Sequence, residues 1–148
     1  MVAKTINLTF EGYWREEKKD SIPADSGIYL VYSCKYNAPT NTVDLTKLIY
    51  IGETKDVDDR IDKHEKWGLW RNNVPDGQQL CFAFAKIASP DRERAECALI
   101  YYHQPVCCTQ CMNSFDYDET TVVSDCAEAM RTLELIKSPI TVKRTVNQ

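Results

Sequence analysis

One acidic side chain within an apolar helix face is the first feature of this sequence that points to chemistry. Residues 90–103 are predicted to form a helix, because Ser89 and Pro90 are typical of a helix start and Pro105 follows its end. Glu96 falls on the apolar face, where a carboxylate is costly unless a cation or hydrogen bonds meet it. A structural ion pair with an arginine is one solution, and a divalent metal ion is the other.

An arginine and a histidine lie one helical turn apart in the predicted polar helix 55–66. Arg60 and His64 flank the narrow apolar stripe formed by Val57 and Ile61. Side chains at the margin of a buried seam reach into a cleft rather than into bulk water. Phosphoryl transfer needs such cationic support, together with a metal ion and an in-line nucleophile. An ordinary solvated helix face is the alternative interpretation.

Two tripeptides place a tyrosine close to a glycine in stretches with strand character. Residues 27–29 (GIY) open the stretch GIYLVYSCKY, and residues 50–52 (YIG) close the stretch KLIYIG. A glycine removes the Cβ, so that backbone or a ligand can come close to the neighbouring phenol. The turn NAPTNT between the stretches predicts a hairpin with the tripeptides on antiparallel neighbours. Tyrosines that only pack in the core are the alternative.

The order of these groups resembles the GIY-YIG nuclease family: two strand tyrosines, then an arginine, a histidine and a helical glutamate. The resemblance covers about residues 25–113 of a chain of 148 residues, which is expected to be a single domain. It implies an α+β fold with a small antiparallel sheet flanked by helices. The core of this sheet would have three strands, and the terminal strands could extend the sheet.

The resemblance also implies an activity and a role for each residue. The chain would be a divalent-metal-dependent endonuclease that hydrolyses phosphodiester bonds of nucleic acid, with DNA as the expected partner. Glu96 would hold one Mg²⁺ or Mn²⁺ ion, Arg60 would neutralise phosphoryl oxygens, and His64 would orient groups or relay a proton. Either Tyr29 or Tyr50 would be the general base, helped by a cation because a free phenol has a pKa of about 10. The expected substrate-binding residues are Gly27, Gly52, Lys55 and Asn113.

Two departures from the family pattern bear on this activity. The gap between the tripeptides is longer than usual, which predicts an extension of the hairpin. The family usually has an asparagine in a Pro-x-x-Asn run after the glutamate helix, but here Cys108 takes that position and Asn113 follows later. A thiol cannot replace both hydrogen-bonding functions of an amide. A catalytically inactive nucleic-acid-binding module that retains the nuclease fold is therefore the alternative function.

The remaining elements complete the expected domain. Residues 5–14 and 79–87 are predicted to be strands, and the second belongs to the core of the sheet. A helix is predicted over residues 124–136, followed by a final strand over residues 140–146 that pairs with the N-terminal one. The helix over residues 55–66 is expected to begin at Thr54 or Asp56 and to end at Gly68.

The composition limits the function classes. With 43% hydrophobic and 27% charged residues, the chain is typical of a globular domain rather than a disordered one. No apolar run approaches the about 20 residues of a membrane span, and the first residues do not resemble a signal peptide. We therefore expect a cytoplasmic protein without membrane contact. The net charge of −4 argues against broad binding of nucleic acid, so a nuclease would depend on local positive charge.

The seven cysteines are expected to be reduced, because their number is odd and no export signal is seen. Four potential zinc ligands form a tight group that contains one C-x₂-C half. A structural zinc site usually needs a second such half, which is absent, although Cys126 is a further donor. A structural zinc is therefore not expected. The group consists of His103, Cys107, Cys108 and Cys111.

Overall fold

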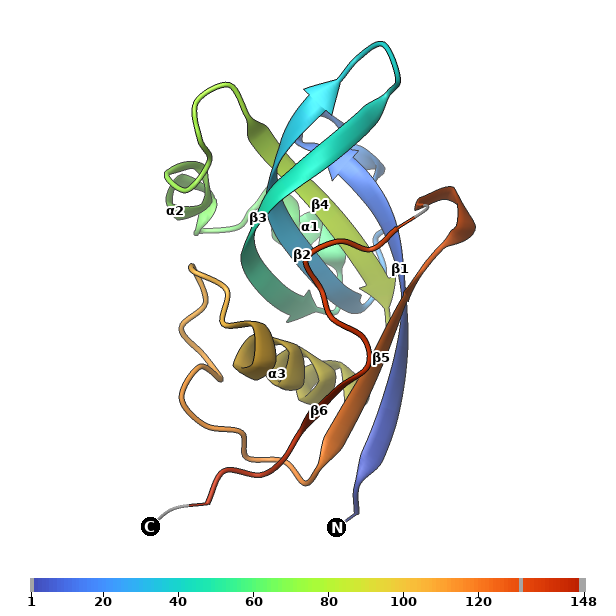
Figure 1. Cartoon of the computed structure of the whole chain (residues 1–148), viewed down its shortest axis with the longest axis vertical. Helices are drawn as coiled ribbons and strands as arrows, with labels where there is room; N and C mark the ends of the chain where they lie inside the picture. The colour runs from blue at the N-terminus through green and yellow to red at the C-terminus, as the bar shows by residue number, and fades with distance from the viewer. Residues whose placement is uncertain (1, 131, 147–148) are drawn as a thin grey trace.

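A single six-stranded sheet organises the protein. The computed structural model describes residues 2–130 and 132–146, with the strand order β3-β2-β4-β1-β5-β6 (Figure 1). Neighbouring strands are antiparallel, apart from the parallel pair of β1 and β5. The strands are β1 (Lys4–Arg15), β2 (Gly27–Asn37), β3 (Thr42–Thr54), β4 (Gln79–Lys86), β5 (Thr120–Cys126) and β6 (Ile140–Val142).

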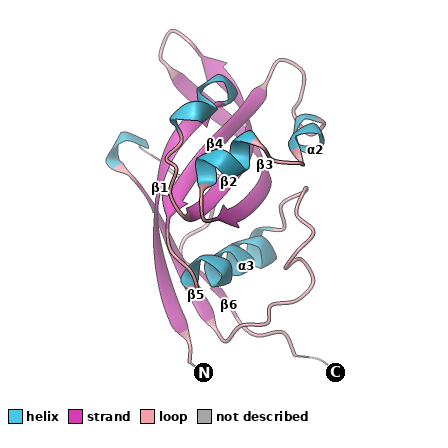
Figure 2. Ribbon diagram, turned by 180° about the vertical axis from the view of Figure 1, so that it is seen from behind, coloured by secondary structure: helices cyan, strands magenta, loops and turns pink. Residues whose placement is uncertain are grey.

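Helices pack on both faces of this sheet. Figure 2 shows α1, α2 and α3 around the sheet. Side chains of β2 alternate between two cores, with Ile28 and Leu30 packing toward α3 and Tyr29 and Val31 toward α1 and α2. Because both faces of β2 are buried, its sequence is a nearly continuous run of apolar residues. None of the helices in the described ranges has the length and apolar character needed to cross a membrane. The helices and 3₁₀ turns are η1 (Glu16–Ser21), α1 (Val57–Asp62), α2 (Trp67–Arg71), α3 (Asp91–His103) and η2 (Glu128–Met130).

The expected fold class, a small three-stranded sheet flanked by helices, is wrong. Strands β3, β2 and β4 are neighbours, and the predicted hairpin pairing of β2 with β3 is confirmed. However, the long β1 serves two partners: residues 10–15 pair with β4, and residues 4–10 pair with β5. The sheet therefore continues through β1, and Figure 1 shows it bending so that β5 and β6 run beside α3.

The C-terminal elements also differ from the prediction. Residues 120–126 form β5, because their β-branched side chains suit a strand and β1 offers a parallel partner. Beyond β5, the predicted helix over residues 124–136 is reduced to the turn η2, and residue 131 lies outside the described residues. In the described ranges β6 pairs with β5, so the expected pairing of the two terminal strands is wrong.

The predicted polar helix 55–66 is shorter than expected. Its N-cap is Asp56, as predicted, and the side chain accepts a hydrogen bond from the Asp59 N–H at 3.1 Å. The helix ends early because Trp67 donates its indole N–H to the Ile61 carbonyl at 2.6 Å. The chain then turns into α2, in which Trp70 is fully buried and Gly68 is an interior residue rather than a helix end.

Candidate active site

A pocket of about 180 Å³ opens beside β3, which is an edge strand of the sheet. Five segments form its wall: β3, α1, the turn after α1, the middle of α3, and the loop after α3. The pocket brings together three predicted site residues, Tyr50, Arg60 and Glu96. Its complete lining is Tyr50, Ile51, Arg60, Glu65, Lys66, Glu96, Ile100, Cys108, Thr109 and Gln110.

The two predicted tyrosines share one face of the hairpin. Tyr29 lies opposite Gly52 and Val31 lies opposite Tyr50, which places the two tyrosine rings at a centroid distance of 6.1 Å. Tyr29 is only 1% exposed, whereas Tyr50 is half-buried and reaches the pocket. Burial raises the pKa of Tyr50 to about 12, and it raises the pKa of Tyr29 well above its usual range. Without a nearby cation, neither phenol is a base at neutral pH.

The two predicted glycines allow close packing between strands. A Cβ on Gly52 would lie 2.3 Å from the Tyr29 hydroxyl oxygen, so this position has room only for a glycine. A Cβ on Gly27 would lie 2.2 Å from the carbonyl oxygen of Ala85 on β4. Both glycines are buried, and neither belongs to the lining of the pocket. Their geometry supports the sheet and the position of Tyr29 rather than direct contact with a ligand.

His64 is buried behind the pocket. Its side chain is 0% exposed, and its ring lies 5.3 Å from the ring of Tyr50 and 4.3 Å from that of Trp70, measured between centroids. The Lys66 N–H donates to Nδ1 at 3.0 Å, so the proton of the neutral ring is on Nε2. Nε2 has no hydrogen-bond partner among the described residues. Burial lowers the pKa of His64 to about 4, which keeps the imidazole neutral near pH 7.

Arg60 is held by a carboxylate of the following turn. Its Nη1 donates to Glu65 Oε2 at 2.6 Å, and its Nη2 donates to Glu65 Oε1 at 3.0 Å. Hydrogen bonding to Arg60 lowers the pKa of Glu65 to about 2. The positive charge of Arg60 also acts on the Tyr29 hydroxyl and opposes the rise in its pKa, and the Tyr29 ring neighbours that of Tyr50. A chain of polar groups thus runs from Tyr50 in the pocket through Tyr29 and Arg60 to Glu65 at the surface.

Glu96 projects from α3 into the pocket and is half-buried. Among the described residues no cation forms an ion pair with it. The nearby Arg92 pairs with Glu53 and Glu93 instead. Burial and the negative charge of Glu53 raise the pKa of Glu96 to about 8. The predicted alternative of a structural ion pair at Glu96 is therefore not what these residues form.

The pocket has room for one hydrated divalent cation beside Glu96. The Glu96 carboxylate is available, and the volume of about 180 Å³ greatly exceeds the about 10–15 Å³ that one water needs. In the described residues no group of three potential protein ligands gathers around a point. Mg²⁺ suits such a site, because it keeps several waters and often binds one or two carboxylates together with a substrate phosphate.

The cysteine at the position of the family's asparagine has a contact of its own in the structure. Cys108 lines the pocket, and its Sγ lies 3.4 Å from both the backbone nitrogen and the backbone oxygen of Ile51. This contact and the hydrogen bond from Cys107 N to Ile49 O (2.9 Å) fasten the loop to the edge of β3. Asn113 is exposed and outside the pocket lining, so it does not take the place of the missing amide.

Lys66, which was not among the predicted site residues, contributes the second positive charge of the pocket. Lys66 donates from Nζ to the Cys107 carbonyl at 3.3 Å and lies 5.3 Å from the centre of the Tyr50 ring. The predicted Lys55 is exposed and does not line the pocket. The only sequence signal for Lys66 is its position two residues after His64, which a continuous helix would have turned away.

The four potential zinc donors named from the sequence, for which no zinc is expected, have other contacts in the structure. Cys97 and Cys111 form a disulfide, so the expectation that all cysteines are reduced is wrong for these two, and the other five are free. His103 donates from Nδ1 to the Leu99 carbonyl at 3.0 Å and accepts the Lys137 N–H at Nε2, also at 3.0 Å. Both ring nitrogens of His103 are therefore occupied within the protein.

A larger hollow lies at the opposite end of the hairpin. Its volume is about 390 Å³, and its lining includes Tyr13, Asn41 and Met130. It contains none of the predicted site residues. The smaller pocket is the better candidate, because a carboxylate, a guanidinium, an ammonium and a phenol converge there.

These groups define a candidate phosphoryl-transfer site, since that reaction needs a metal-binding carboxylate and cations facing one cavity. Comparison of the chain with protein-family models, with curated proteins and with solved structures finds no match. The interpretation of the pocket therefore rests on its own residues.

Proposed function

We propose that this chain is a divalent-metal-dependent endonuclease domain of the GIY-YIG type, which hydrolyses phosphodiester bonds of nucleic acid, with DNA as the expected substrate. One observation carries the proposal. The half-buried Glu96 carboxylate faces the same pocket as Arg60 and Tyr50 and has no ion pair in the described part of the chain. A buried carboxylate without a cation is costly, and this cost favours binding of a metal ion.

Each side chain has a role that its position supports. Glu96 would hold one Mg²⁺ or Mn²⁺ ion, which supplies Lewis-acid stabilisation of phosphoryl oxygens and a more acidic water. Arg60 and Lys66 would bind the phosphate, since both line the pocket. Tyr50 would accept the proton of the attacking water, because it reaches the pocket and Tyr29 does not. Tyr29 would position Tyr50 and Arg60 through its hydroxyl.

His64 would act from behind Tyr50. Its neutral ring carries an unpartnered Nε2–H, its centroid lies 5.3 Å from that of the Tyr50 ring, and burial keeps this proton in place near pH 7. Donation of this N–H to the phenolate of Tyr50 would stabilise the negative charge that Tyr50 carries when it acts as a base. His64 is therefore proposed as a positioning residue that lowers the pKa of Tyr50.

A catalytically inactive nucleic-acid-binding module is the second candidate function. Two observations favour it: Glu65 neutralises Arg60, and Cys108 stands where the family usually has an asparagine.

A cytoplasmic location is likewise a proposal. The disulfide between Cys97 and Cys111 argues against it, because cytosolic thiols are kept reduced.

Nicking of supercoiled plasmid DNA in Mg²⁺ distinguishes the two functions. The nuclease proposal expects wild type to convert the plasmid to the nicked form and expects Glu96→Ala to lose this conversion. EDTA should abolish the wild-type reaction. If wild type and Glu96→Ala give the same background while both retard the plasmid in a gel, the binding module is favoured.

A further inference from the structure

The contact between Arg60 and Glu65 has the geometry of phosphate recognition. A carboxylate that accepts hydrogen bonds from both terminal nitrogens of a guanidinium offers two oxygens in one plane, as a phosphate does. The two distances, 2.6 and 3.0 Å, are those of a well-formed bidentate pair. Glu65 therefore occupies the donors of Arg60 that a substrate phosphate in this pocket would use.

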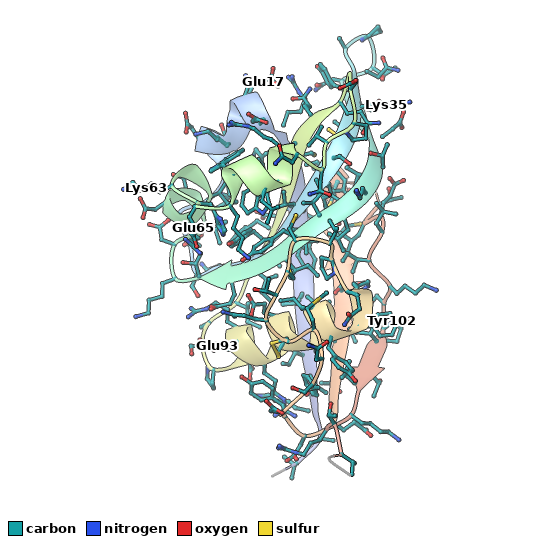
Figure 3. The ribbon with its side chains drawn as sticks, turned by 90° about the vertical axis from the view of Figure 1, so that its left-hand side faces the viewer. Glu17, Lys35, Lys63, Glu65, Glu93 and Tyr102 are labelled. Carbon is teal, nitrogen blue, oxygen red and sulfur yellow. A yellow bond between two sulfur atoms is a disulfide. The ribbon has the colours of Figure 1, made fainter. Side chains whose placement is uncertain are left out.

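The Glu65 side chain is free to leave Arg60 without unfolding the turn. It is 64% exposed, and Figure 3 shows it near the surface between α1 and α3. The backbone around it is fixed, because buried His64 accepts the Lys66 N–H and the Trp67 N–H donates to the His64 carbonyl at 3.3 Å. A rotation of one exposed side chain is enough to release the guanidinium.

The released arginine would remain in place. Its guanidinium also interacts electrostatically with the Tyr29 hydroxyl, and Tyr29 is held over Gly52 in the core. Exposed ion pairs contribute little to stability, so exchange of the carboxylate for another anion costs the fold little. The exchange is favourable only when other cations share the charge of the incoming group, and Lys66 lines the same pocket.

From this geometry we propose that Glu65 is a specificity-determining residue, whose carboxylate competes with the substrate phosphate for Arg60. The inference rests on the proposed function. It means that a phosphate is held only where a metal ion at Glu96 or the ammonium of Lys66 supports it, and that the remaining nucleic-acid backbone is bound weakly. Weak general binding agrees with the net charge of −4.

Binding of a fluorescein-labelled DNA duplex of about 20 base pairs, measured by anisotropy in EDTA, tests the proposal without cleavage. Glu65→Gln should bind about tenfold more tightly than wild type, because it frees Arg60. Asp59→Asn is the matched control, since it removes the same charge from another exposed ion pair, the one with Lys63 at 2.9 Å. It should change the affinity by no more than about twofold.

Removal of Arg60 completes the test. In an Arg60→Ala background, Glu65→Gln should no longer increase the affinity, because no guanidinium remains to be released. Equal gains from Glu65→Gln and Asp59→Asn would overturn the inference and leave the proposed function standing, as would a gain that persists without Arg60. If none of these proteins binds the duplex, in EDTA or with Ca²⁺, the proposed function itself fails and the inference fails with it.

Discussion

Tyr29 lies directly across the hairpin from Gly52, so closely that a Cβ on the glycine would lie 2.3 Å from the phenol oxygen. The glycine of the second tripeptide thus makes room for the tyrosine of the first. This relationship explains why the two motifs occur together: the Tyr29 ring, which neighbours Tyr50 and interacts with Arg60, can occupy its position only if residue 52 has no side chain.

Substitution of Gly52 by alanine should therefore destabilise the fold. We expect Gly52→Ala to lower the free energy of unfolding by about 1–3 kcal/mol, because the added methyl group displaces the Tyr29 ring. Gly68→Ala is the control, since nothing lies within 4 Å of a Cβ there and the residue is in α2. It should raise stability by about 0.5–1 kcal/mol. Urea denaturation measures both, and equal effects would contradict the packing at Gly52.

Protonation of His64 should destabilise the protein in mild acid. The pKa of about 4 in the folded state lies below the usual 6.5, so the unfolded chain binds the proton more readily between these values. The free energy of unfolding should therefore fall by about 2–3 kcal/mol as the pH drops from 6.5 to 4. His64→Gln should lack this part of the pH dependence. Parallel stability profiles of the two proteins, measured by urea denaturation, would rule out a buried neutral imidazole.

Glu96 should have the opposite pH dependence. Its pKa of about 8 exceeds the usual 4.5, so the folded state keeps a proton that the unfolded chain releases. Stability from this group should decrease between pH 4.5 and 8, by at most about 1.4 kcal/mol per pH unit. Glu96→Gln should consequently melt at a higher temperature than wild type at pH 8. Mg²⁺ should raise the melting temperature of wild type alone, and an equal rise in the variant would place the ion elsewhere.

The disulfide should be detectable by counting thiols. In denaturant, five cysteines should react with a thiol reagent before reduction, and all seven should react afterwards. Because the bond closes a loop with a sequence separation of 14, its reduction should cost about 3 kcal/mol of stability. The loop includes part of the pocket wall, so Cys111→Ser should also weaken cleavage. Seven reactive thiols in unreduced protein would show that Cys97 and Cys111 are not joined.

Local patterns predicted the parts of the fold that local interactions determine. The hairpin followed from two apolar β-rich stretches around a polar turn, and α3 followed from its Ser-Pro start and the proline beyond its end. Strand β5 was missed because its position depends on a parallel pairing with β1, more than a hundred residues earlier in the chain. Residues 127–136 contain good helix formers, but this weak local preference does not decide their conformation.

In the candidate site, too, the residues were predictable from the sequence, but the contacts that depend on tertiary structure were not. Tyr50, Arg60 and Glu96 were predicted from residue type and order, and all three line one pocket. The contact of Glu65 with Arg60 and the position of Lys66 depend on the turn between α1 and α2, which the sequence presented as a continuous helix. The position of Cys108 likewise depends on how its loop meets the edge of β3.

The single-turnover rate of DNA cleavage as a function of Mg²⁺ concentration tests the central proposal most directly. The wild-type rate should rise with Mg²⁺ and reach a plateau, and Glu96→Gln should lower that plateau by at least about a thousandfold. Glu93→Gln, one turn earlier on the same helix face, should stay within about threefold of wild type. A Glu96→Gln protein that cleaves DNA as fast as wild type, or a wild-type rate independent of Mg²⁺, would contradict a metal-dependent nuclease built on this carboxylate.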